Sequence, residues 1–305
     1  MIKSTMRAAQ KSIVFFPLML AACGGGGTTS GGGGVVSTPT PASYTKLADM
    51  TGDRSFQTAG VQYRVVTDPP AYFAEGATQS FGSGVVIAYT AASDSYKLTA
   101  ADGSTVTFTP ADTITPGAEA SLQRLKTNGA INDQLTIFKT AVNGVSLSYL
   151  MAGSWVHRDP ANNASISRLA IGGSPTIASD MPRSGSATYS TAVNGTMLAN
   201  GTPFTLTGSS TATFSADFAA NSVATALTLT GVQSTGTTVA NFGTFSGTGA
   251  ISSSNSAFTG TLSGTGATGV FSGAFFGPQA KEMGYSWFLN AGIVQGAGFV
   301  VGVKN

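Results

Sequence analysis

Very few side chains in this sequence could take part in chemistry. The chain has 305 residues, of which 40 are Gly but only one is Cys and one is His, and charged residues make up just 9%. The single histidine, His157, stands in the run Trp155-Val-His-Arg-Asp159. A Ser-His-acid triad would need a serine that the fold brings to this histidine, and serines are so frequent here that such proximity arises without function. We expect His157 to pack or to meet solvent at a strand end, with a ligand contact as the alternative.

The composition excludes several classes of site. One cysteine and one histidine leave no intrachain disulfide, no thiolate cluster and no multi-histidine metal site. The segment Gly82-Ser-Gly84 lacks the third glycine of a dinucleotide-binding loop, and no P-loop, G-x-S-x-G elbow or D-x-D-x-D-G calcium loop occurs. So few Lys and Arg residues leave no basic face for nucleic acid. The sequence therefore predicts a protein that is not an enzyme and uses no cofactor, no metal and no nucleic acid.

The single cysteine lies where a lipid would be attached. Three basic residues precede a short apolar run, 13–22, which is too short to span a bilayer and is typical of a secretory signal. The following Leu20-Ala-Ala-Cys23-Gly24 resembles the lipobox of bacterial lipoproteins, in which cleavage leaves a diacylglyceryl cysteine as the first residue. We therefore predict a signal peptide at 1–22 and lipidation of Cys23. A plain signal peptide with an incidental cysteine is the alternative.

The residues after the cysteine favour a tethered, membrane-anchored protein. Removal of 1–22 takes away three cations and no acidic residue, so the net charge falls from +2 to −1. Two acyl chains hold a protein stably on a membrane, so this anchor needs no transmembrane helix. Residues 24–42, GGGGTTSGGGGVVSTPTPA, are typical of a flexible coil with an r.m.s. span of about 25 Å. We predict the lipidated cysteine and its tether at 23–43, and Gly24, in place of Asp, favours delivery to the outer membrane.

Residues 44–175 are predicted to form a β-rich region. Alternating runs with the period of two expected of half-buried strands occur at 61–66, 84–89, 95–98, 105–108, 134–138 and 145–155. The pair Asp102-Gly103 is a hairpin signal between two of these runs. The segment Glu119–Lys126 is the one place where the pattern favours a short helix.

Residues 176–305 are predicted to form an eight-stranded antiparallel barrel. Strand-like runs separated by Gly, Ser, Thr and Asn turns occur at 184–193, 204–217 (bent at Gly208), 223–230, 238–249, 256–263, 269–276, 284–290 and 297–303. Phe214, Ala216 and Phe218 share one face of the second run. Closure protects strand edges that carry so little charge. The predicted fold class is therefore all-β, a small handle-like region followed by a barrel whose interior holds side chains or one small ligand.

An integral outer-membrane barrel is the alternative with the same number of strands. Its lipid face would need an apolar band flanked by girdles of aromatic residues. The predicted strands carry Thr, Ser and Gly at those positions instead, so the sequence disfavours this alternative.

Two motifs in the predicted barrel resemble those of a known family. The run Gly273-Ala-Phe-Phe-Gly-Pro-Gln-Ala-Lys-Glu-Met-Gly284 resembles the signature G-x-F-[FY]-G-P-x-A-x-E-x-G that closes the barrel of transferrin-binding protein B and its relatives. The run Asp180–Tyr189 is similar to that family's M-P-x-x-G-x-A-x-Y barrel opening, and Ser148–Trp155 to the Tyr…Gly-x-Trp strand before it. The motif residues are Met181, Pro182, Gly185, Tyr189, Gly273, Phe275, Phe276, Gly277, Pro278, Ala280, Glu282 and Gly284.

The closing motif also has a physical interpretation. Phe275 and Phe276 are consecutive in a strand and therefore point to opposite faces of it, and Gly277 ends that strand. The residues that follow are predicted to make one helical turn, which Gly284 lets the chain leave, with Glu282 hydrogen-bonded to backbone amides. We interpret the motif as structural, with contact to a ligand as the alternative.

The resemblance implies a lipid-anchored outer-membrane protein, at the cell surface rather than on the periplasmic face, that captures a host protein or a solute without catalysis. Many members of the family need a dedicated outer-membrane translocator, and the large transferrin receptors carry two handle–barrel lobes where this sequence has one. The implied partners are therefore the membrane, a translocator and a protein or small-solute ligand. A structural, envelope-assembly lipoprotein without a soluble ligand is the alternative. Trp155 and Trp287 are expected in the core or at an interface.

Overall fold

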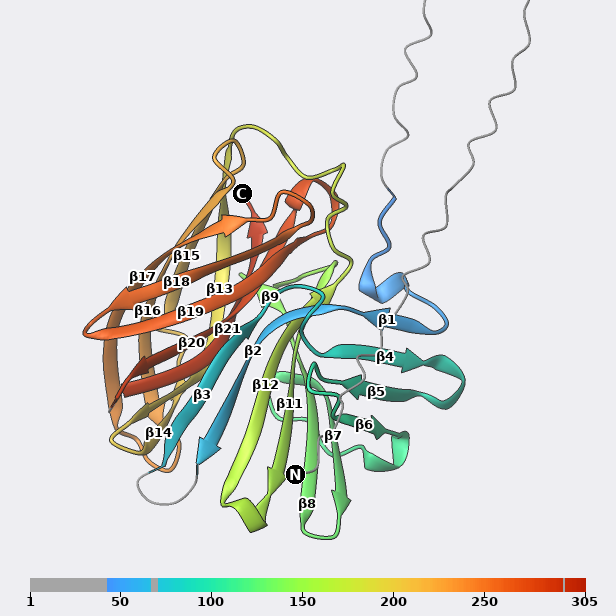
Figure 1. Ribbon diagram of the computed structural model, residues 1–305, viewed down its shortest axis with the longest axis vertical. Coiled ribbons are helices and arrows are strands. Elements are labelled where there is room, and N and C mark those ends of the chain that lie inside the picture. Colours follow the sequence, from blue (N-terminus) through green and yellow to red (C-terminus); the bar gives the residue numbers. More distant parts are fainter. Residues whose placement is uncertain (1–42, 67–70, 293) are drawn as a thin grey trace, which may run out of the picture. The chain divides into compact units, whose positions relative to one another are not determined.

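Alternating apolar and small polar residues give β-strands through most of the residues that the structure describes (Figure 1). The computed structural model describes residues 43–66, 71–292 and 294–305, so the predicted signal peptide, Cys23 and nearly all of the predicted tether lie outside the described residues. Residues 41–305 form one unit. In the described residues, helix is limited to single 3-10 turns, at Leu47–Asp49, Ala91–Ser93, Pro110–Asp112, Pro160–Asn162 and Pro278–Ala280.

The first twelve strands form the part of the molecule that we call the handle. Their bounds are β1 Arg54–Phe56, β2 Thr58–Val66, β3 Tyr72–Gln79, β4 Val86–Thr90, β5 Ser95–Thr99, β6 Thr105–Phe108, β7 Ala120–Asn128, β8 Ile131–Phe138, β9 Ala141–Val142, β10 Val145–Ser146, β11 Leu150–Asp159 and β12 Ala164–Gly173. They make a four-stranded sheet, β1-β4-β5-β6, a six-stranded sheet, β3-β2-β12-β11-β8-β7, and the hairpin β9-β10. All pairings are antiparallel, and the hairpin predicted at Asp102-Gly103 joins β5 to β6.

The helix predicted at Glu119–Lys126 is wrong, because this segment is the edge strand β7. A bulge between Ala120 and Leu122 interrupts the alternation of the strand and gives its apolar residues a helix-like spacing. After the bulge, Leu122 and Arg124 pair with Ile137 and Leu135 of β8, so both face the four-stranded sheet. Long-range pairing and burial thus outweigh the local preference of the segment.

The single strand predicted at 145–155 is also wrong, because it is divided between β10 and β11. The backbone N–H groups of Ser148, Tyr149 and Leu150 do not join a ladder there but are bound by the carboxylate of Glu282. A carboxylate that accepts several backbone N–H groups replaces the hydrogen bonds of a strand.

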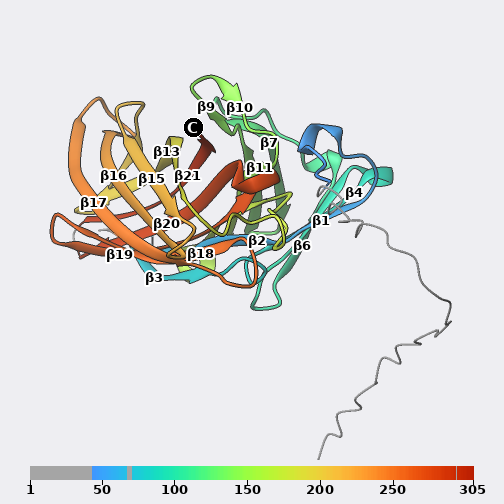
Figure 2. The ribbon, with the colours of Figure 1, turned by 90° about the horizontal axis from the view of Figure 1, so that it is seen from above.

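The last nine strands form the barrel. Their bounds are β13 Ser186–Ala199, β14 Thr202–Leu206, β15 Thr211–Asp217, β16 Ser222–Gln233, β17 Val239–Ile251, β18 Ala257–Gly264, β19 Ala267–Phe276, β20 Glu282–Ala291 and β21 Val294–Lys304. β13 pairs with β21 along 11 residues and closes the ring (Figures 1 and 2). The run predicted at 204–217 is two strands, β14 and β15, which both lie between β13 and β16 and share one place in the ring. The predicted eight-stranded closed ring is confirmed.

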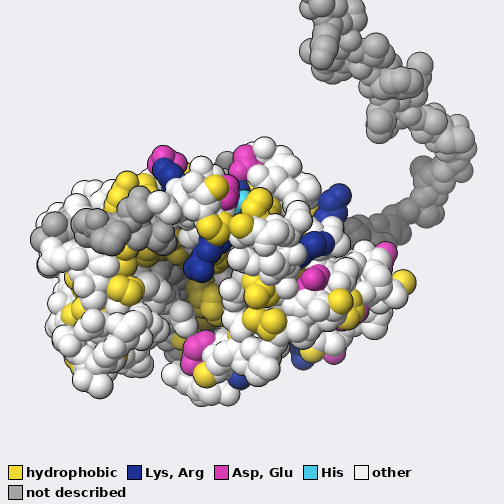
Figure 3. Space-filling model, turned by 90° about the horizontal axis from the view of Figure 1, so that it is seen from below, with side chains coloured by type: hydrophobic (Ala, Val, Ile, Leu, Met, Phe, Trp, Pro, Cys, Tyr) yellow, Lys and Arg dark blue, Asp and Glu magenta, His cyan; other side chains and the backbone are white. Residues whose placement is uncertain are grey.

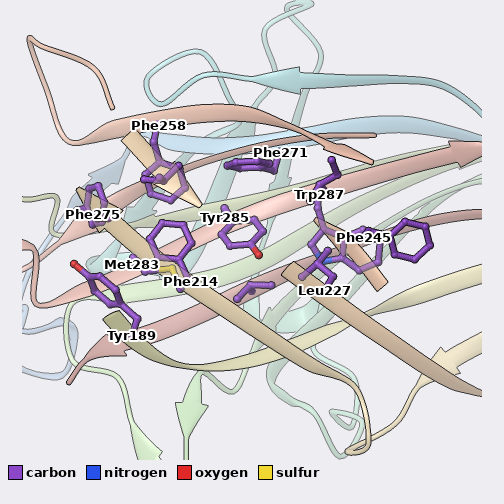
Figure 4. Close-up of a cluster of buried hydrophobic side chains, with 14 of the residues drawn as sticks. Tyr189, Phe214, Leu227, Phe245, Phe258, Phe271, Phe275, Met283, Tyr285 and Trp287 are labelled. Carbon is purple, nitrogen blue, oxygen red and sulfur yellow. The ribbon is translucent and has the colours of Figure 1, made fainter. Parts of the chain in front are cut away.

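The interior of the barrel is filled by aromatic side chains (Figure 4). Phe214 lies with its ring centroid 5.2 Å from that of Phe258 and 5.7 Å from that of Tyr285. Inside this core, the hydroxyls of Thr225 and Tyr285 are 2.6 Å apart, so the buried phenol has the partner that a polar group in an apolar interior requires. The sequence predicts an interior that holds either side chains or one small ligand, and the structure shows it filled with side chains.

The six-stranded sheet of the handle packs on the outside of the barrel. On the face of this sheet that packs against the barrel, Val61, Tyr63 and Leu169 share a buried cluster with Phe288 of β20. The ring centroids of Tyr63 and Phe288 are 5.9 Å apart. Gly76 of β3 makes room for this contact, because a Cβ there would lie 2.2 Å from the Phe288 ring. The opposite face of the same sheet is covered by the four-stranded sheet, so the handle has a core of its own.

Candidate functional site

The opening and closing motifs of the barrel lie against each other. The Tyr189 hydroxyl donates to the Ala280 carbonyl at 2.7 Å, and both residues are buried with Met181 in the barrel core. Burial raises the pKa of Tyr189, so its phenol stays protonated and remains the donor. Gly185, at φ +74°, offers its carbonyl to the N–H of Phe218 at 3.0 Å. The first bond fastens β13 to the turn before β20, and the second joins the residue before β13 to the residue after β15.

Phe275 and Phe276 point to opposite faces of β19, as predicted. Phe275 lies in the barrel interior with its ring centroid 5.0 Å from that of Phe258 (Figure 4). Phe276 lies outside the barrel, where its ring meets the edge of the Phe81 ring of the handle at 6.1 Å. The two consecutive rings therefore serve the barrel core and the handle–barrel interface.

Glu282 joins the barrel to the handle through its buried carboxylate. It is 2% exposed at the start of β20. One carboxylate oxygen accepts the N–H of Ser148 at 2.7 Å, and the other accepts the N–H groups of Tyr149 at 2.8 Å and Leu150 at 3.2 Å. The predicted bonds to backbone amides are thus confirmed, and the amides belong to residues 148–150, where the chain enters β11 of the handle.

Two glycines of the closing motif permit close approach of the handle. Gly277 has φ +70°, and a Cβ there would lie 2.5 Å from the ring of Tyr149. The sequence predicts that Gly284 lets the chain leave a turn, but in the structure Gly284 lies inside β20. A Cβ on Gly284 would lie 2.8 Å from Ile171 of β12, so its role is close packing between strands.

The helical turn predicted at Gln279–Glu282 is present only as the single 3-10 turn Pro278–Ala280, and its backbone is not that of a right-handed helix. Gln279 and Ala280 have φ +52° and +55°, which is left-handed backbone. The Gln279 N–H donates to the Asp180 carboxylate at 3.0 Å, and the Gln279 side chain also donates to Asp180. These bonds hold the chain in a tight turn that a right-handed helix could not make.

The remaining motif residues lie beside this turn. Gly273 of β19 faces β20, where a Cβ would lie 2.2 Å from the Gly284 carbonyl oxygen. Pro182 and Pro278 are half-buried next to Met181 and Gly277. We propose that the whole motif is structural, because the contacts of its members described above are made within this chain.

Asp180 anchors the start of the described chain to the barrel. Its carboxylate accepts the hydroxyl of Tyr44 at 2.8 Å, and the Tyr44 oxygen accepts the Ile177 N–H at 2.9 Å. Burial raises the pKa of Tyr44 to about 12. The hydrogen bond from Ile177 lowers this pKa, and the nearby Asp180 carboxylate raises it further. Partial burial alone would raise the pKa of Asp180, but the hydrogen bonds from Gln279 and Tyr44 outweigh it and lower that pKa.

His157 makes no triad with a serine in the contacts that the structure describes. Its Nδ1 lies 2.8 Å from Asp133 Oδ1, and the same oxygen accepts the Trp155 indole N–H at 2.8 Å. The His157 side chain is 33% exposed near the end of β11, beside a cavity of about 340 Å³ that Arg64 and Glu75 also line. A histidine that meets solvent at a strand end is what the sequence predicts.

Both tryptophans are core residues, as predicted. Trp287 is fully buried in the barrel, where Gly195 and Gly298 leave room for its indole ring. Trp155 is 2% exposed in the handle, and the guanidinium of Arg168 lies 4.4 Å above its ring.

An apolar groove in the handle is the strongest candidate for a binding site. Its volume is about 620 Å³. We call it the handle groove, and its main lining residues are Leu47, Met50, Arg54, Phe56, Tyr89, Tyr96, Ile137 and Met151. The rings of Tyr89 and Tyr96 lie 4.9 Å apart, and the guanidinium of Arg124 lies 4.9 Å from the Tyr96 ring.

The handle groove is lined by residue types that are common at protein–protein interfaces. Its aromatic and methionine side chains are half-buried, and interface residues that contribute most binding energy are enriched in Tyr, Trp and Arg. Arg54 at its rim adds one charged group. Sequence reasoning missed this site, because its residues come from separate segments. The only local signal is the pair Tyr89 and Tyr96, which flank one turn of the four-stranded sheet.

Other kinds of site find no support in the residues that the structure describes. These residues contain no group of three or more His, Cys, Asp or Glu side chains that could hold a metal ion. In the same residues, no helix has the length and apolar character needed to cross a membrane.

A family model identifies the barrel. Residues 181–303 match the family described as the C-lobe and N-lobe beta barrels of Tf-binding protein B. No curated protein matches the sequence.

Several solved structures are similar to this chain. Two are transferrin-binding protein B: a mutant from Haemophilus parasuis, at 14% identity and TM-score 0.45, and isotype 1 from Neisseria meningitidis, at 18% and 0.44. They are matched over 84% of this chain but 46% and 44% of their own, so the chain spans less than half of their length. HpuA from Kingella denitrificans in complex with human haemoglobin matches at 20% identity and TM-score 0.39, over 86% of this chain and 91% of that one.

Proposed function

From a barrel that belongs to the transferrin-binding protein B family over residues 181–303, we propose that this chain is a lipid-anchored outer-membrane protein that binds a partner without catalysing a reaction. The family match is the observation that carries this proposal. The handle groove, with its half-buried aromatic side chains, supports a protein partner over a small solute. The relatives point the same way, since their names record binding of transferrin, lactoferrin and haemoglobin.

The proposed anchor is the lipid on Cys23, followed by a Gly-rich tether. The lipobox-like run 20–24 and the two runs of four glycines support this part of the proposal. A diacylated cysteine holds a protein on a membrane without a transmembrane segment. We place the protein at the cell surface and propose that a dedicated outer-membrane translocator carries it there. We also propose that the chain is divided into a handle at 44–175 and a barrel at 176–305.

Protease shaving of intact cells tests the location. Wild type should disappear from unbroken cells treated with a protease, whereas Cys23→Ser should not be retained in the outer-membrane fraction. Survival of wild type until the outer membrane is opened would place it on the periplasmic face instead. An unchanged membrane association of Cys23→Ser would overturn the lipid anchor.

Direct binding assays test the groove. Immobilised mature chain is exposed to human transferrin, lactoferrin and haemoglobin in turn, and the variants Tyr89→Ala and Tyr96→Ala are compared with wild type. Truncation of an aromatic residue that dominates an interface costs about 2 kcal/mol or more, so at least one of these variants should lose about 25-fold or more in affinity for a ligand that binds in the groove. Tyr72→Ala is the matched control, since Tyr72 is 46% exposed on β3 and does not line the groove. Equal binding by all three variants would exclude the groove as the site.

A structural, envelope-assembly lipoprotein is the second candidate. Between residues 186 and 305 the charged residues are Asp217, Lys281, Glu282 and Lys304 alone, and the side of the molecule seen in Figure 3 is correspondingly uncharged over most of the barrel. A surface with so little charge suits packing within an assembly. A deletion strain with a leaky envelope and normal nutrient uptake would favour this candidate over ligand capture.

A further inference from the structure

A second cavity of the handle gathers ionisable side chains. Its volume is about 340 Å³, at the small end of the range that is typical of ligand sites. It lies at the end of the six-stranded sheet where β2 and β11 end and β3 and β12 begin. Charged residues make up only 9% of the chain, so four ionisable side chains around one small cavity are a local concentration of charge. We call it the charged cavity, and its lining includes Arg64, Glu75, His157, Asp159, Ala164 and Ile166.

The strand register builds the floor and two walls of the charged cavity. Ile166 of β12 is the cross-strand neighbour of Arg64 on β2 and of His157 on β11. Residues directly opposite each other in a sheet project from the same face. Since adjacent strands are about 4.8 Å apart, the backbones of Arg64 and His157 stand about 10 Å apart, on either side of the apolar Ile166. Ala164 and Asp159 are paired two residues further along the same strands and extend this arrangement to the end of the sheet.

A bulge in β3 places Glu75 at the cavity. Glu75 and Gly76 together oppose Tyr63 alone, where the pairing of β3 with β2 shifts register. The backbone of Glu75 is left-handed, with φ +55°, a conformation that glycine usually supplies in such a bulge. Bulges re-aim side chains beside functional sites, and strained backbone positions cluster at such sites. The fold thus brings a carboxylate to the cavity wall at a conformational cost.

The charged groups on the walls have binding capacity that the fold does not use. Among the described residues, neither the Arg64 guanidinium nor the Glu75 carboxylate makes a hydrogen bond or an ion pair, although both side chains line the same cavity. The Asp159 carboxylate accepts the Ala161 N–H and the Asn162 side-chain amide. A carboxylate has about four acceptor sites, so Asp159 can accept further donors.

His157 adds one more acceptor. Its Nδ1 lies 2.8 Å from Asp133 Oδ1, and an ionised carboxylate can only accept, so Nδ1 carries the hydrogen. The neutral ring then presents Nε2 as an acceptor, and Nε2 has no partner among the described residues. The charged cavity therefore offers one cation, on Arg64, and three acceptors, on Glu75, Asp159 and His157.

This set of groups matches one class of small molecule. A planar guanidinium is suited to a carboxylate, which it can bind through two parallel N–H groups. An ammonium group has three donors and no acceptor, so three acceptors can satisfy it. The described residues contain no group of three or more His, Cys, Asp or Glu side chains that could hold a metal ion. A molecule that carries a carboxylate and an ammonium group a short distance apart is an α-amino acid.

We propose that the charged cavity binds a free α-amino acid with a small, uncharged side chain. Arg64 holds its carboxylate, and Glu75, Asp159 and His157 hold its ammonium group. The small volume and the apolar Ile166 of the floor select a short side chain without charge. The ligand contact that the sequence leaves open for His157 is thereby assigned. This site is separate from the handle groove and does not rest on the function proposed there.

Calorimetric titration of the mature full-length chain carrying Cys23→Ser tests this assignment. The probes are glycine, L-alanine, L-serine, L-threonine and L-valine, and at least one of them should bind. Arg64→Gln and Glu75→Gln should each weaken that binding about tenfold or more, because a hydrogen bond to a charged group is lost, and both should keep the thermal transition of the parent. Arg158→Gln and Glu119→Gln remove the same charges at exposed positions outside the cavity, and these matched controls should bind like the parent.

Ligand analogues separate the two halves of the site. For L-alanine, propionate keeps the carboxylate and ethylamine keeps the ammonium group, and each should bind about tenfold or more weakly than the amino acid. The proposal is overturned if none of the amino acids binds, if either analogue binds as well as the amino acid, or if Arg64→Gln and Glu75→Gln bind like the parent. Binding that Tyr89→Ala weakens and Arg64→Gln does not would place the amino acid in the handle groove and would also overturn the proposal.

Discussion

The carboxylate of Glu282, on the first residue of β20, accepts the backbone N–H of Tyr149 at 2.8 Å across the boundary between barrel and handle. The same carboxylate binds Ser148 and Leu150, so one side chain satisfies three consecutive N–H groups. It does so while 2% exposed, which makes these hydrogen bonds strong and their loss costly. The handle and the barrel are therefore expected to unfold together.

Replacing Glu282 should destabilise both parts of the molecule. Glu282→Gln keeps one acceptor oxygen but turns an NH₂ group toward a backbone N–H, and we expect a loss of about 2–4 kcal/mol in the free energy of unfolding. Urea denaturation followed by tryptophan fluorescence reports on the handle through Trp155 and on the barrel through Trp287. Glu75→Gln, on an exposed position of β3, is the control. Two separate transitions in wild type would contradict the expected coupling.

A glycine series separates backbone strain from close packing. Gly277→Ala should cost about 3 kcal/mol, because it combines φ +70° with a Cβ only 2.5 Å from the Tyr149 ring. Gly103→Ala should cost about 1 kcal/mol, since φ is +84° but nothing lies within 4 Å of the new Cβ. Gly208→Ala has open space and no positive φ, so its free energy of unfolding should be unchanged or slightly raised. Thermal unfolding measures all three variants. Equal losses in the free energy of unfolding for Gly277→Ala and Gly103→Ala would show that the Tyr149 ring moves aside without cost.

The barrel could be predicted because its signals are local. Phe214, Ala216 and Phe218 alternate with polar residues, and all three are buried inside. Alternation of this kind depends only on the strand period. The bend at Gly208 is local too, and it separates β14 from β15.

Contacts between distant segments could not be predicted in the same way. The sequence indicates that Glu282 binds backbone amides, but the amides at 148–150 are more than 130 positions away. The edge strand β7 appears helical until its pairing with β8 is known. The handle groove exists only through the packing and register of several strands, and no pattern along the chain encodes it.

Arg168 should be sensitive even to a conservative change. It is 1% exposed, lies over the Trp155 ring, and donates from Nε to Gln62 at 2.9 Å and from Nη2 to Asp102 at 2.8 Å. An ammonium group cannot make these contacts at once, so Arg168→Lys should cost about 2–4 kcal/mol. It should also shift the emission of Trp155. Arg158→Lys, on an exposed side chain of β11, should change neither the free energy of unfolding nor the emission, and a silent Arg168→Lys would show that the buried guanidinium is dispensable.

Asp180 should make the stability of the protein depend on acid pH. Hydrogen bonds from Gln279 and Tyr44 overcome the effect of burial and hold the pKa of Asp180 below its ordinary value of 3.8. A carboxyl group whose pKa is lower in the folded state stabilises that state fully above the ordinary value, and the contribution is lost as the pH falls through the lowered pKa. Asp180→Asn should therefore be less stable than wild type at pH 7, and the difference should shrink below about pH 4. Urea denaturation between pH 2.5 and 7 checks this, with Asp217→Asn as the control, since the Asp217 carboxylate accepts one exposed backbone N–H. A difference that is the same at every pH would show that the Asp180 carboxylate is not what ties Gln279 and Tyr44 to the barrel.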